Sequence, residues 1–367
     1  MTIEDIALTM TSGVGVKGAV HLLEVFGDAQ HIFAATFDEL VGRAVLREDV
    51  ARSILRREAF AVAEKELAYC ARHGIVAVAS TDAAYPVLLR EVIDYPAVLY
   101  VLGNVEVLSA HCVSLVGTRE ATTYGQDMCH RLVRGLAARV PNLCIVSGLA
   151  FGIDVASHRA ALAADVPTVG VLANPLPKIT PAQHTPVGRE IVEKGGALIT
   201  ELHSQVKQTG DFYLARNRII AALSEGTIIV ESPCAGGSLM TAHCADGYNR
   251  SLMAVPGRAS DQMSLGTNLL IRNRKAQLVL SADDVIAELM WDVHVKDVLE
   301  RPRARVSELT TDEAGLLGCF RTDDPLSTGE LGVLSGLDAG ALSVLLLGLE
   351  LAGAVRQLPG NRYEKKR

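Results

Sequence analysis

The sequence predicts an α/β fold: a Rossmann-like parallel sheet, preceded by an N-terminal helical domain and followed by a C-terminal winged helix. From about residue 111, short continuous apolar segments alternate with amphipathic helical segments, as in sheets covered by helices on both faces. A charged stretch around Arg301-Pro302-Arg303 then resembles a linker, and three helical segments and a hairpin pattern follow it. The expected domains are a helical domain of the helix-hairpin-helix or SAM-like kind (1–79), the Rossmann-like domain (80–295), a linker (296–305) and the winged helix (306–367).

The first 79 residues have apolar residues at helical spacing. Their one glycine-rich point is Ser12-Gly13-Val14-Gly15-Val16, between two short helical segments. This layout resembles a helix-hairpin-helix, whose glycines let backbone N–H groups approach a phosphate. A turn between two packed helices explains the same pattern, and we favour it.

The Rossmann-like domain contains seven predicted strands and six predicted helices in alternation. The strands are 112–116, 144–147, 168–172, 197–200, 227–231, 252–255 and 277–280; the helices are 124–139, 152–164, 187–194, 213–223, 239–249 and 269–274. Ligands of such sheets bind at the carboxyl ends of the strands. Candidate binding residues are therefore sought where each strand ends.

The C-terminal pattern predicts helices at 312–320, after Ser327-Thr328 and at 339–351, then a hairpin at 354–363 that turns at Pro359-Gly360-Asn361. The third helix has Glu350 as its only charged residue. It lacks the Arg, Lys, Asn or Gln side chains that read base edges, so we expect a supporting or protein-contact role.

Composition restricts the function classes. The net charge of −7 argues against a uniformly basic surface that binds duplex DNA without sequence preference, so a nucleic-acid site needs a local basic pocket. No apolar run reaches the roughly 18 residues of a membrane span. Glu4 and Asp5 stand where a signal peptide carries basic residues, so we expect a cytoplasmic protein with no membrane partner. Seven scattered cysteines without CxxC predict reduced thiols and no structural zinc.

Two common nucleotide signatures are missing. The sequence has no GxxxxGK[ST], and no GxGxxG follows the first predicted strand. Neither a P-loop ATPase nor a typical NAD enzyme is supported, and we expect no cofactor, no metal and no catalytic residue. Asp154 and His158 could be drawn as an acid/base pair on one helix, but no nucleophile or ligand cluster accompanies them. We expect Asp154 to accept hydrogen bonds near its turn instead.

Three strand ends carry small and polar residues that open a helix or a turn. They are Gly117-Thr118-Arg119, Ser147-Gly148, and Gly237-Ser238 with Thr241. Unpaired N–H groups at such places bind anions, and Arg119 adds a planar cationic donor. Three such sites at one sheet edge can hold a phosphodiester or a nucleotide phosphate.

The segment from Phe212 to Arg218 adds aromatic and cationic groups. Phe212 and Tyr213 could stack bases, while Arg216 and Arg218 begin an otherwise apolar helix and are costly to bury unpaired. We expect one of the two arginines to pair inside the fold with Glu201 or Glu231. For Phe212, a position in the hydrophobic core is the alternative to base stacking, and both interpretations remain open.

Six separated motifs resemble those of the DNA processing protein A family, also called DprA or Smf, over about residues 84–285. They are Tyr95–Gly103 (YPAVLYVLG), Gly117-Thr118-Arg119, the SGLAFGID segment from Ser147, the RNRIIA segment from Arg216, the GSLMTA segment from Gly237, and Val255-Pro256-Gly257. The resemblance implies single-stranded DNA as ligand, loading of the RecA recombinase during natural transformation, and a homodimer built through the Rossmann-like domain. The candidate DNA-binding residues are Gly117, Thr118, Arg119, Ser147, Gly148, Phe212, Tyr213, Arg216, Asn217, Arg218, Gly237, Ser238 and Thr241.

The chain departs from the family pattern at three places. The usual GLDxxYP stretch reads as Pro175–Pro181 (PLPKITP), Leu214 and Ala215 stand where a basic residue and a proline are common, and Arg272-Asn273-Arg274-Lys275 replaces a glycine-alanine ending. Lys178 or Lys207 would then supply some phosphate contact.

Two alternatives from other classes remain open at this point. A nucleoside-phosphate phosphoribohydrolase has a similar fold and a PGGxGTxxE turn, but here Ala242-His243-Cys244 follows the turn without an acid. A transcription regulator that uses the winged helix would instead prefer a specific duplex.

Overall fold

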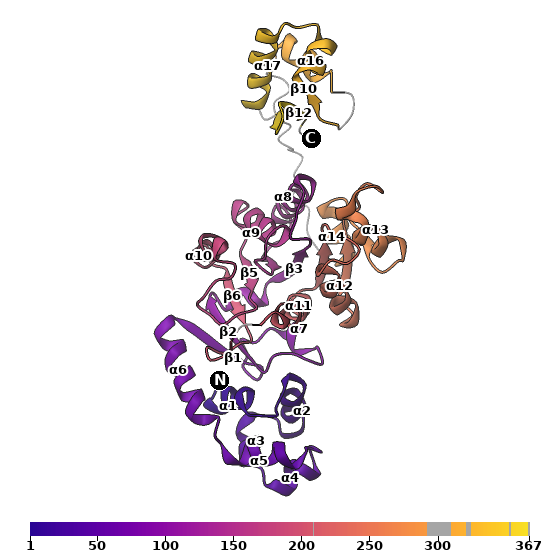
Figure 1. The fold of residues 1–367 in the computed structure, drawn as a ribbon. Coiled ribbons are helices and arrows are strands. Elements are labelled where there is room, and N and C mark those ends of the chain that lie inside the picture. Colours follow the sequence, from indigo (N-terminus) through magenta and orange to yellow (C-terminus); the bar gives the residue numbers. More distant parts are fainter. Residues whose placement is uncertain (208, 292–309, 321–323, 352–353, 366–367) are drawn as a thin grey trace. The chain divides into compact units, whose positions relative to one another are not determined.

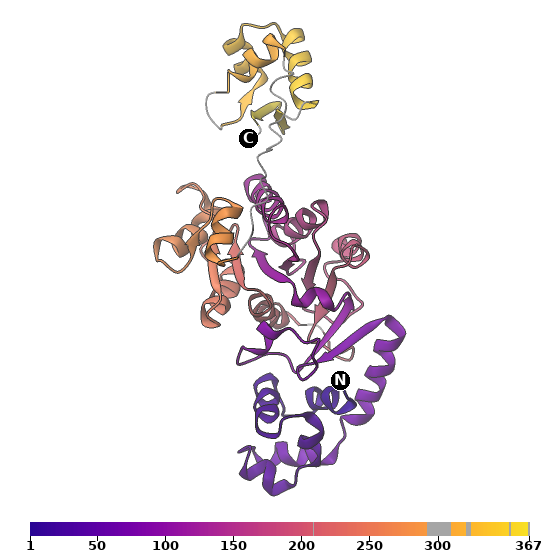
Figure 2. The same ribbon diagram turned by 180° about the vertical axis from the view of Figure 1, so that it is seen from behind.

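The structure is a computed structural model, and it describes residues 1–207, 209–291, 310–320, 324–351 and 354–365. The chain forms two compact units, Met1–His294 and Val295–Arg367. Figures 1 and 2 show both units from opposite sides. The predicted linker, 296–305, lies outside the described residues.

The first unit begins with six helices. Their bounds are α1 (Ile3–Met10), α2 (Val16–Phe26), α3 (Ala29–Ala34), α4 (Phe37–Gly42), α5 (Glu48–Arg56) and α6 (Phe60–His73). Fully buried Ile6, Leu22, Ile32 and Ile54 from four of these helices share one core. The predicted glycine-rich segment forms the turn between α1 and α2, where Gly13 has φ +86°. The six helices together lie beside the first strand of the sheet, β1 (Ile75–Ala79), in Figure 1.

A nine-stranded sheet follows, in the order β1-β2-β6-β5-β4-β3-β7-β8-β9. The strands are β1 (Ile75–Ala79), β2 (Val98–Gly103), β3 (His111–Val116), β4 (Leu143–Ser147), β5 (Thr168–Val171), β6 (Ala197–Thr200), β7 (Gly226–Ile229), β8 (Ser251–Ala254) and β9 (Gln277–Leu278). Strands β3 to β9 pair in parallel, and this confirms the predicted parallel sheet.

The amino-terminal edge of the sheet corrects one expectation. Residues 75–79, predicted to belong to the helical domain, form β1. Strands β1 and β2 are two antiparallel additions to the predicted strands. The helical region ends at His73 because Gly74 adopts the left-handed conformation that closes α6. The short apolar run after it then pairs with β2.

Helices cover both faces of the sheet. Their bounds are α7 (Val87–Arg90), α8 (Thr123–Ala137), α9 (Ile153–Ala163), α10 (Thr185–Glu193), α11 (Asp211–Leu223), α12 (Ser238–Gly247), α13 (Leu265–Arg272) and α14 (Ala282–Glu288), with short 3-10 turns at Glu106–Ser109, Ala182–His184 and Gln262–Ser264. Val113 and Leu115 of β3 pack with α8, α9 and α14. Cys112 and Val116 of the same strand belong to the core that includes α11 and α12. This alternation is what places the carboxyl end of β3 between two helical layers.

The second unit has a winged-helix architecture, as predicted. It contains α15 (Thr311–Leu317), β10 (Leu326–Ser327), α16 (Thr328–Ser335), α17 (Ala339–Leu351), β11 (Val355–Leu358) and β12 (Arg362–Lys365). The three strands pair in the order β10-β12-β11, and β10 is an addition to the predicted hairpin. Leu316, Leu331, Leu346 and Val355 form its core.

Among the described residues, no single helix has the length and apolar composition needed to cross a membrane. The pair Thr328–Ser335 and Ala339–Glu350 meets the length and composition criteria only when taken together, and a bend of 106° separates its two parts.

Candidate nucleic-acid-binding pocket

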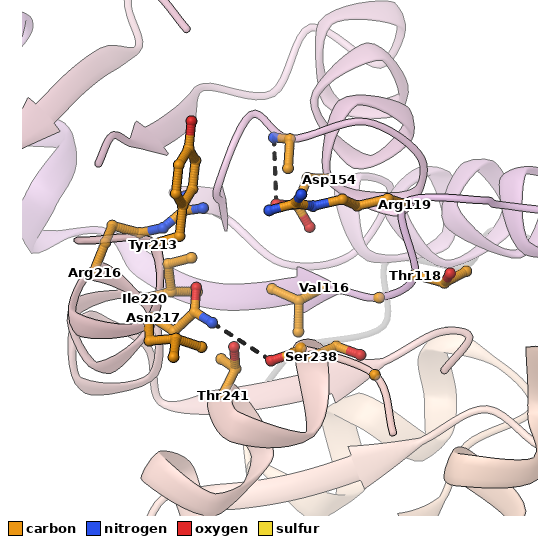
Figure 3. Close-up of a pocket in the computed structure, with 15 residues that line it drawn as sticks. Val116, Thr118, Arg119, Asp154, Tyr213, Arg216, Asn217, Ile220, Ser238 and Thr241 are labelled. Carbon is orange, nitrogen blue, oxygen red and sulfur yellow. Dashed lines mark hydrogen bonds between the residues drawn. The ribbon is translucent and has the colours of Figure 1, made fainter. Parts of the chain in front are cut away.

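A hollow of about 320 Å³ lies at the carboxyl end of β3. Figure 3 shows the side chains around it. The lining residues come from the end of β3 and the turn after it, the β4–α9 loop and first turn of α9, α11, and the start of α12 with the turn before it. They are Val116, Gly117, Thr118, Arg119, Ala150, Asp154, Tyr213, Leu214, Arg216, Asn217, Ile220, Gly236, Gly237, Ser238 and Thr241. The three predicted anion sites thus contribute to one hollow, although the Ser147-Gly148 turn does so through the loop that follows it.

The turn after β3 brings Arg119 to the pocket. Gly117 passes so close to the next strand end that a Cβ there would lie 2.6 Å from the Glu231 carbonyl oxygen. The Thr118 N–H donates to the same oxygen, at 2.7 Å. Arg119 is exposed, and its guanidinium carbon lies 5.5 Å from the centre of the Tyr213 ring. In Figure 3, Arg119 enters the pocket from the side opposite Tyr213 and Arg216.

The turn after β4 supplies a buried carboxylate. Asp154, in the first turn of α9, is 7% exposed and accepts a hydrogen bond from the Ala150 N–H at 3.4 Å. This contact agrees with the expected role of Asp154 as an acceptor near its turn. Burial raises the pKa of Asp154, and the charges of Arg216 and Arg119 oppose that effect.

Arg216 is the buried cation of the pocket. It is 5% exposed, and its Nη1 donates to the Val171 carbonyl oxygen. Its Nε is buried and has no hydrogen-bond partner. Burial lowers the pKa of Arg216, whereas the charge of Asp154 raises it. Two arginines and one aspartate are the charged residues of the lining, so the pocket has an excess of positive charge.

The third predicted anion site is the start of α12. Gly237, Ser238 and Thr241 line the pocket, so the amino end of this ten-residue helix faces the hollow. The Ser238 hydroxyl donates to the Ser232 hydroxyl at 2.9 Å, and Asn217 of α11 donates to the Gly237 carbonyl oxygen at 3.5 Å. The positive end of the helix dipole adds to the field of the arginines.

Nine of the thirteen predicted residues line the pocket, and four do not. Ser147 is fully buried, and its hydroxyl donates to the Leu115 carbonyl oxygen at 2.6 Å. Gly148 lies behind the pocket, where a Cβ would overlap the Arg216 guanidinium. Phe212 is half-buried outside the lining.

Arg218 faces away from the pocket. It pairs with Glu201 and donates to the Asp94 carbonyl oxygen. This confirms that one of the two arginines pairs inside the fold. The reason is helical geometry: residues two apart do not share a face, so Arg216 and Arg218 point in different directions. For Ser147 and Arg218, the structure therefore places the side chain in an internal contact rather than at the site.

Several lining residues are not among the thirteen candidate residues. Ala150, Leu214, Ile220 and Gly236 have no polar side chain, and only their position within or beside the motifs could have indicated them. His158, the suggested partner of Asp154, is fully buried outside the lining, with Nδ1 2.8 Å from the Thr168 hydroxyl. Among the described residues, no group of three or more His, Cys, Asp or Glu side chains could hold a metal ion.

The fold and the site define a class of protein: a Rossmann-like domain with a cationic pocket at its strand ends, on a chain that also contains a winged helix. Residues 76–290 match the family model of DNA recombination-mediator protein A, and residues 300–361 match that of the DprA winged helix domain. The chain therefore belongs to the DNA processing protein A family, and the resemblance seen in its motifs is confirmed.

Relatives and solved structures support this membership. The chain is 31% identical to Protein Smf of Escherichia coli over 290 residues (77% of this chain, 75% of that protein). It is 33% identical to the DNA processing protein DprA of Bacillus subtilis over 251 residues (67% and 83%). The crystal structure of DNA processing protein A from Streptococcus pneumoniae is similar with a TM-score of 0.68 and 28% identity, covering 78% of this chain and 98% of that one. A structure that describes the single-stranded DNA binding mode of the Helicobacter pylori protein is similar with a TM-score of 0.53 and 28% identity (60% and 98%).

Proposed function

We propose that this protein binds single-stranded DNA in the pocket at the end of β3. The observation that carries the proposal is the arrangement of Arg119 over the Tyr213 ring, beside buried Arg216 and the amino end of α12. Cations and a helix amino end attract backbone phosphates, and an aromatic ring stacks an unpaired base of any kind. A relative from Helicobacter pylori, whose structure concerns single-stranded DNA binding, supports the same ligand.

Titration and cross-linking test this proposal. A fluorescent, mixed-sequence single strand that contains photoreactive bromodeoxyuridine is titrated with the protein near physiological ionic strength, then irradiated. We expect saturable binding and a base–peptide adduct within α11, at or next to Tyr213. Binding whose adducts map only outside the pocket elements would contradict the proposed site.

We further propose that the bound strand is passed to the RecA recombinase in the cytoplasm, that the protein acts as a homodimer, and that it is not an enzyme. Family membership and the motifs support these statements. The test of loading is RecA filament formation on a strand already coated with single-strand binding protein. We expect this protein to shorten the lag before filaments form; an unchanged lag would contradict loading. Sedimentation equilibrium tests the dimer.

The phosphoribohydrolase alternative is not favoured. Asp154 is the one carboxylate of the described lining, and it lies beside the buried cation Arg216, whose charge opposes its acting as a general base. Incubation with nucleoside monophosphates tests the alternative, and we expect no released base.

A further inference from the structure

We infer that Phe151 is a second base-stacking platform, at the rim of the pocket and on a different element from Tyr213. Phe151 lies in the β4–α9 loop and was not among the expected site residues. Its side chain is 45% exposed. The inference rests on the proposed single-strand binding. Single exposed apolar residues are common on protein surfaces, so the position and rigidity of Phe151 carry the argument.

The neighbours of Phe151 place it at the pocket. Ala150, directly before it, lines the hollow. Gly152, directly after it, packs on the main chain of the β3 turn, where a Cβ would lie 2.6 Å from the Arg119 carbonyl carbon. The Ile153 N–H also donates to the Thr118 carbonyl oxygen, at 3.1 Å. Phe151 is therefore attached to the same turn that presents Arg119.

The loop that carries Phe151 has a fixed conformation. Leu149 and Gly152, on either side, have φ of +58° and +76°. A backbone conformation with positive φ at a residue such as leucine is retained only where the surrounding contacts hold it in place. His184, which is buried, has its Nδ1 2.8 Å from the Leu149 carbonyl oxygen. The His184 ring contacts the Phe151 ring edge to face, with ring centres 4.7 Å apart. A ring held in this way loses little freedom when a base stacks on it.

Two aromatic side chains thus accompany Arg119. Tyr213 lies within 5.5 Å of its guanidinium, and Phe151 lies on the loop packed against its main chain. A strand whose phosphate meets Arg119 can place one base toward each ring. Stacking on aromatic rings tolerates any base, as binding of mixed sequences requires.

The test separates stacking from a structural effect. Full-length protein and its Phe151→Ala and Phe151→Trp variants are titrated by fluorescence anisotropy with a mixed-sequence single strand, and with an abasic strand of equal length. We expect Phe151→Ala to weaken binding of the base-containing strand about fivefold or more, from the loss of one stacked base, and to leave binding of the abasic strand unchanged. Phe151→Trp should retain wild-type affinity.

Ile93→Ala is the matched control, because Ile93 is 72% exposed and does not line the pocket. It should bind both strands like the wild type. Equal affinity of wild type and Phe151→Ala for the base-containing strand would overturn the inference, and so would an equal loss for both strands, because the loop would then act only structurally. Failure of the wild type to bind either strand would instead overturn the proposed function.

Discussion

Arg216 and Asp154 approach one another in the space that Gly148 leaves by having no side chain. A Cβ at Gly148 would overlap the Arg216 guanidinium and lie 2.5 Å from Asp154 Oδ2. The two charges are both buried, and each compensates part of the desolvation cost of the other. Because Arg216 also lines the pocket, these two buried charges connect the packing of the sheet edge to the pocket.

Gly148→Ala should therefore displace Arg216 and weaken single-strand binding by about tenfold, equivalent to about 1.4 kcal/mol. The free energy of unfolding should fall by about 1–3 kcal/mol, as for overpacking of a tight site. Urea unfolding and anisotropy titration measure both effects. Gly237→Ala is the control for stability, since a Cβ there meets nothing within 4 Å. Equal stability of the two variants would contradict this account of Gly148.

Arg119→Ala should weaken DNA binding and leave the melting temperature nearly unchanged, because Arg119 is exposed and contributes little to the core. The slope of log affinity against log salt should decrease by about 0.7, the value for one phosphate contact of a single strand. Arg52→Ala is the matched control, because Arg52 lies 5.6 Å from the Phe37 ring but is remote from the pocket lining. An unchanged salt slope for Arg119→Ala would show that Arg119 does not contact phosphate.

His158 should make stability depend on pH. The Thr168 hydroxyl donates to the Ile145 carbonyl oxygen, so His158 Nδ1 carries the proton in its bond to Thr168, while Nε2 is buried without a partner. Burial, helped by the charge of Arg216, lowers the pKa of His158 to about 3.

Below pH 6.5, the unfolded chain binds a proton at His158 that the folded chain does not bind, so stability falls as the pH falls from about 6.5 toward 3. Between pH 7 and pH 5 the expected loss from this residue is about 2 kcal/mol. His158→Gln should be less stable at pH 7 and lose less on acidification, as measured by urea unfolding at both pH values. Parallel losses in wild type and variant would contradict the assignment.

Removal of the winged helix should have little effect on the affinity for a single strand. The pocket lies entirely in the unit Met1–His294, and the exposed side chains of α17 include Val344 and Leu347 rather than base-reading groups. A truncation after His294 should bind within about threefold of the full chain near physiological salt. A tenfold loss, in a truncated protein that circular dichroism shows to be folded, would place part of the DNA site in the winged helix.

The parallel strands could be predicted from the sequence because their continuous apolar runs have the length of a strand that is buried on both faces of the sheet. It did not predict β1, because Ile75–Ala79 is a short run directly after a long helix, and only pairing with β2 makes it a strand. In the site, Arg119 and the start of α12 could be predicted from residue types at strand ends. Ser147 and Arg218 are a serine and an arginine, like the pocket-lining Ser238 and Arg119. Their side chains instead contact Leu115 and Glu201, partners that only the tertiary fold supplies. Which side chain points into a hollow depends on such partners.

The most direct test of the central claim is the affinity for a single strand relative to the duplex of the same sequence. Both are used as competitors against a labelled mixed-sequence strand, at equal nucleotide concentration and near physiological ionic strength. Because duplex bases offer no free face to Tyr213, we predict that the single strand competes at least about tenfold better. Equal or tighter binding of the duplex would contradict the claim that the pocket holds unpaired DNA.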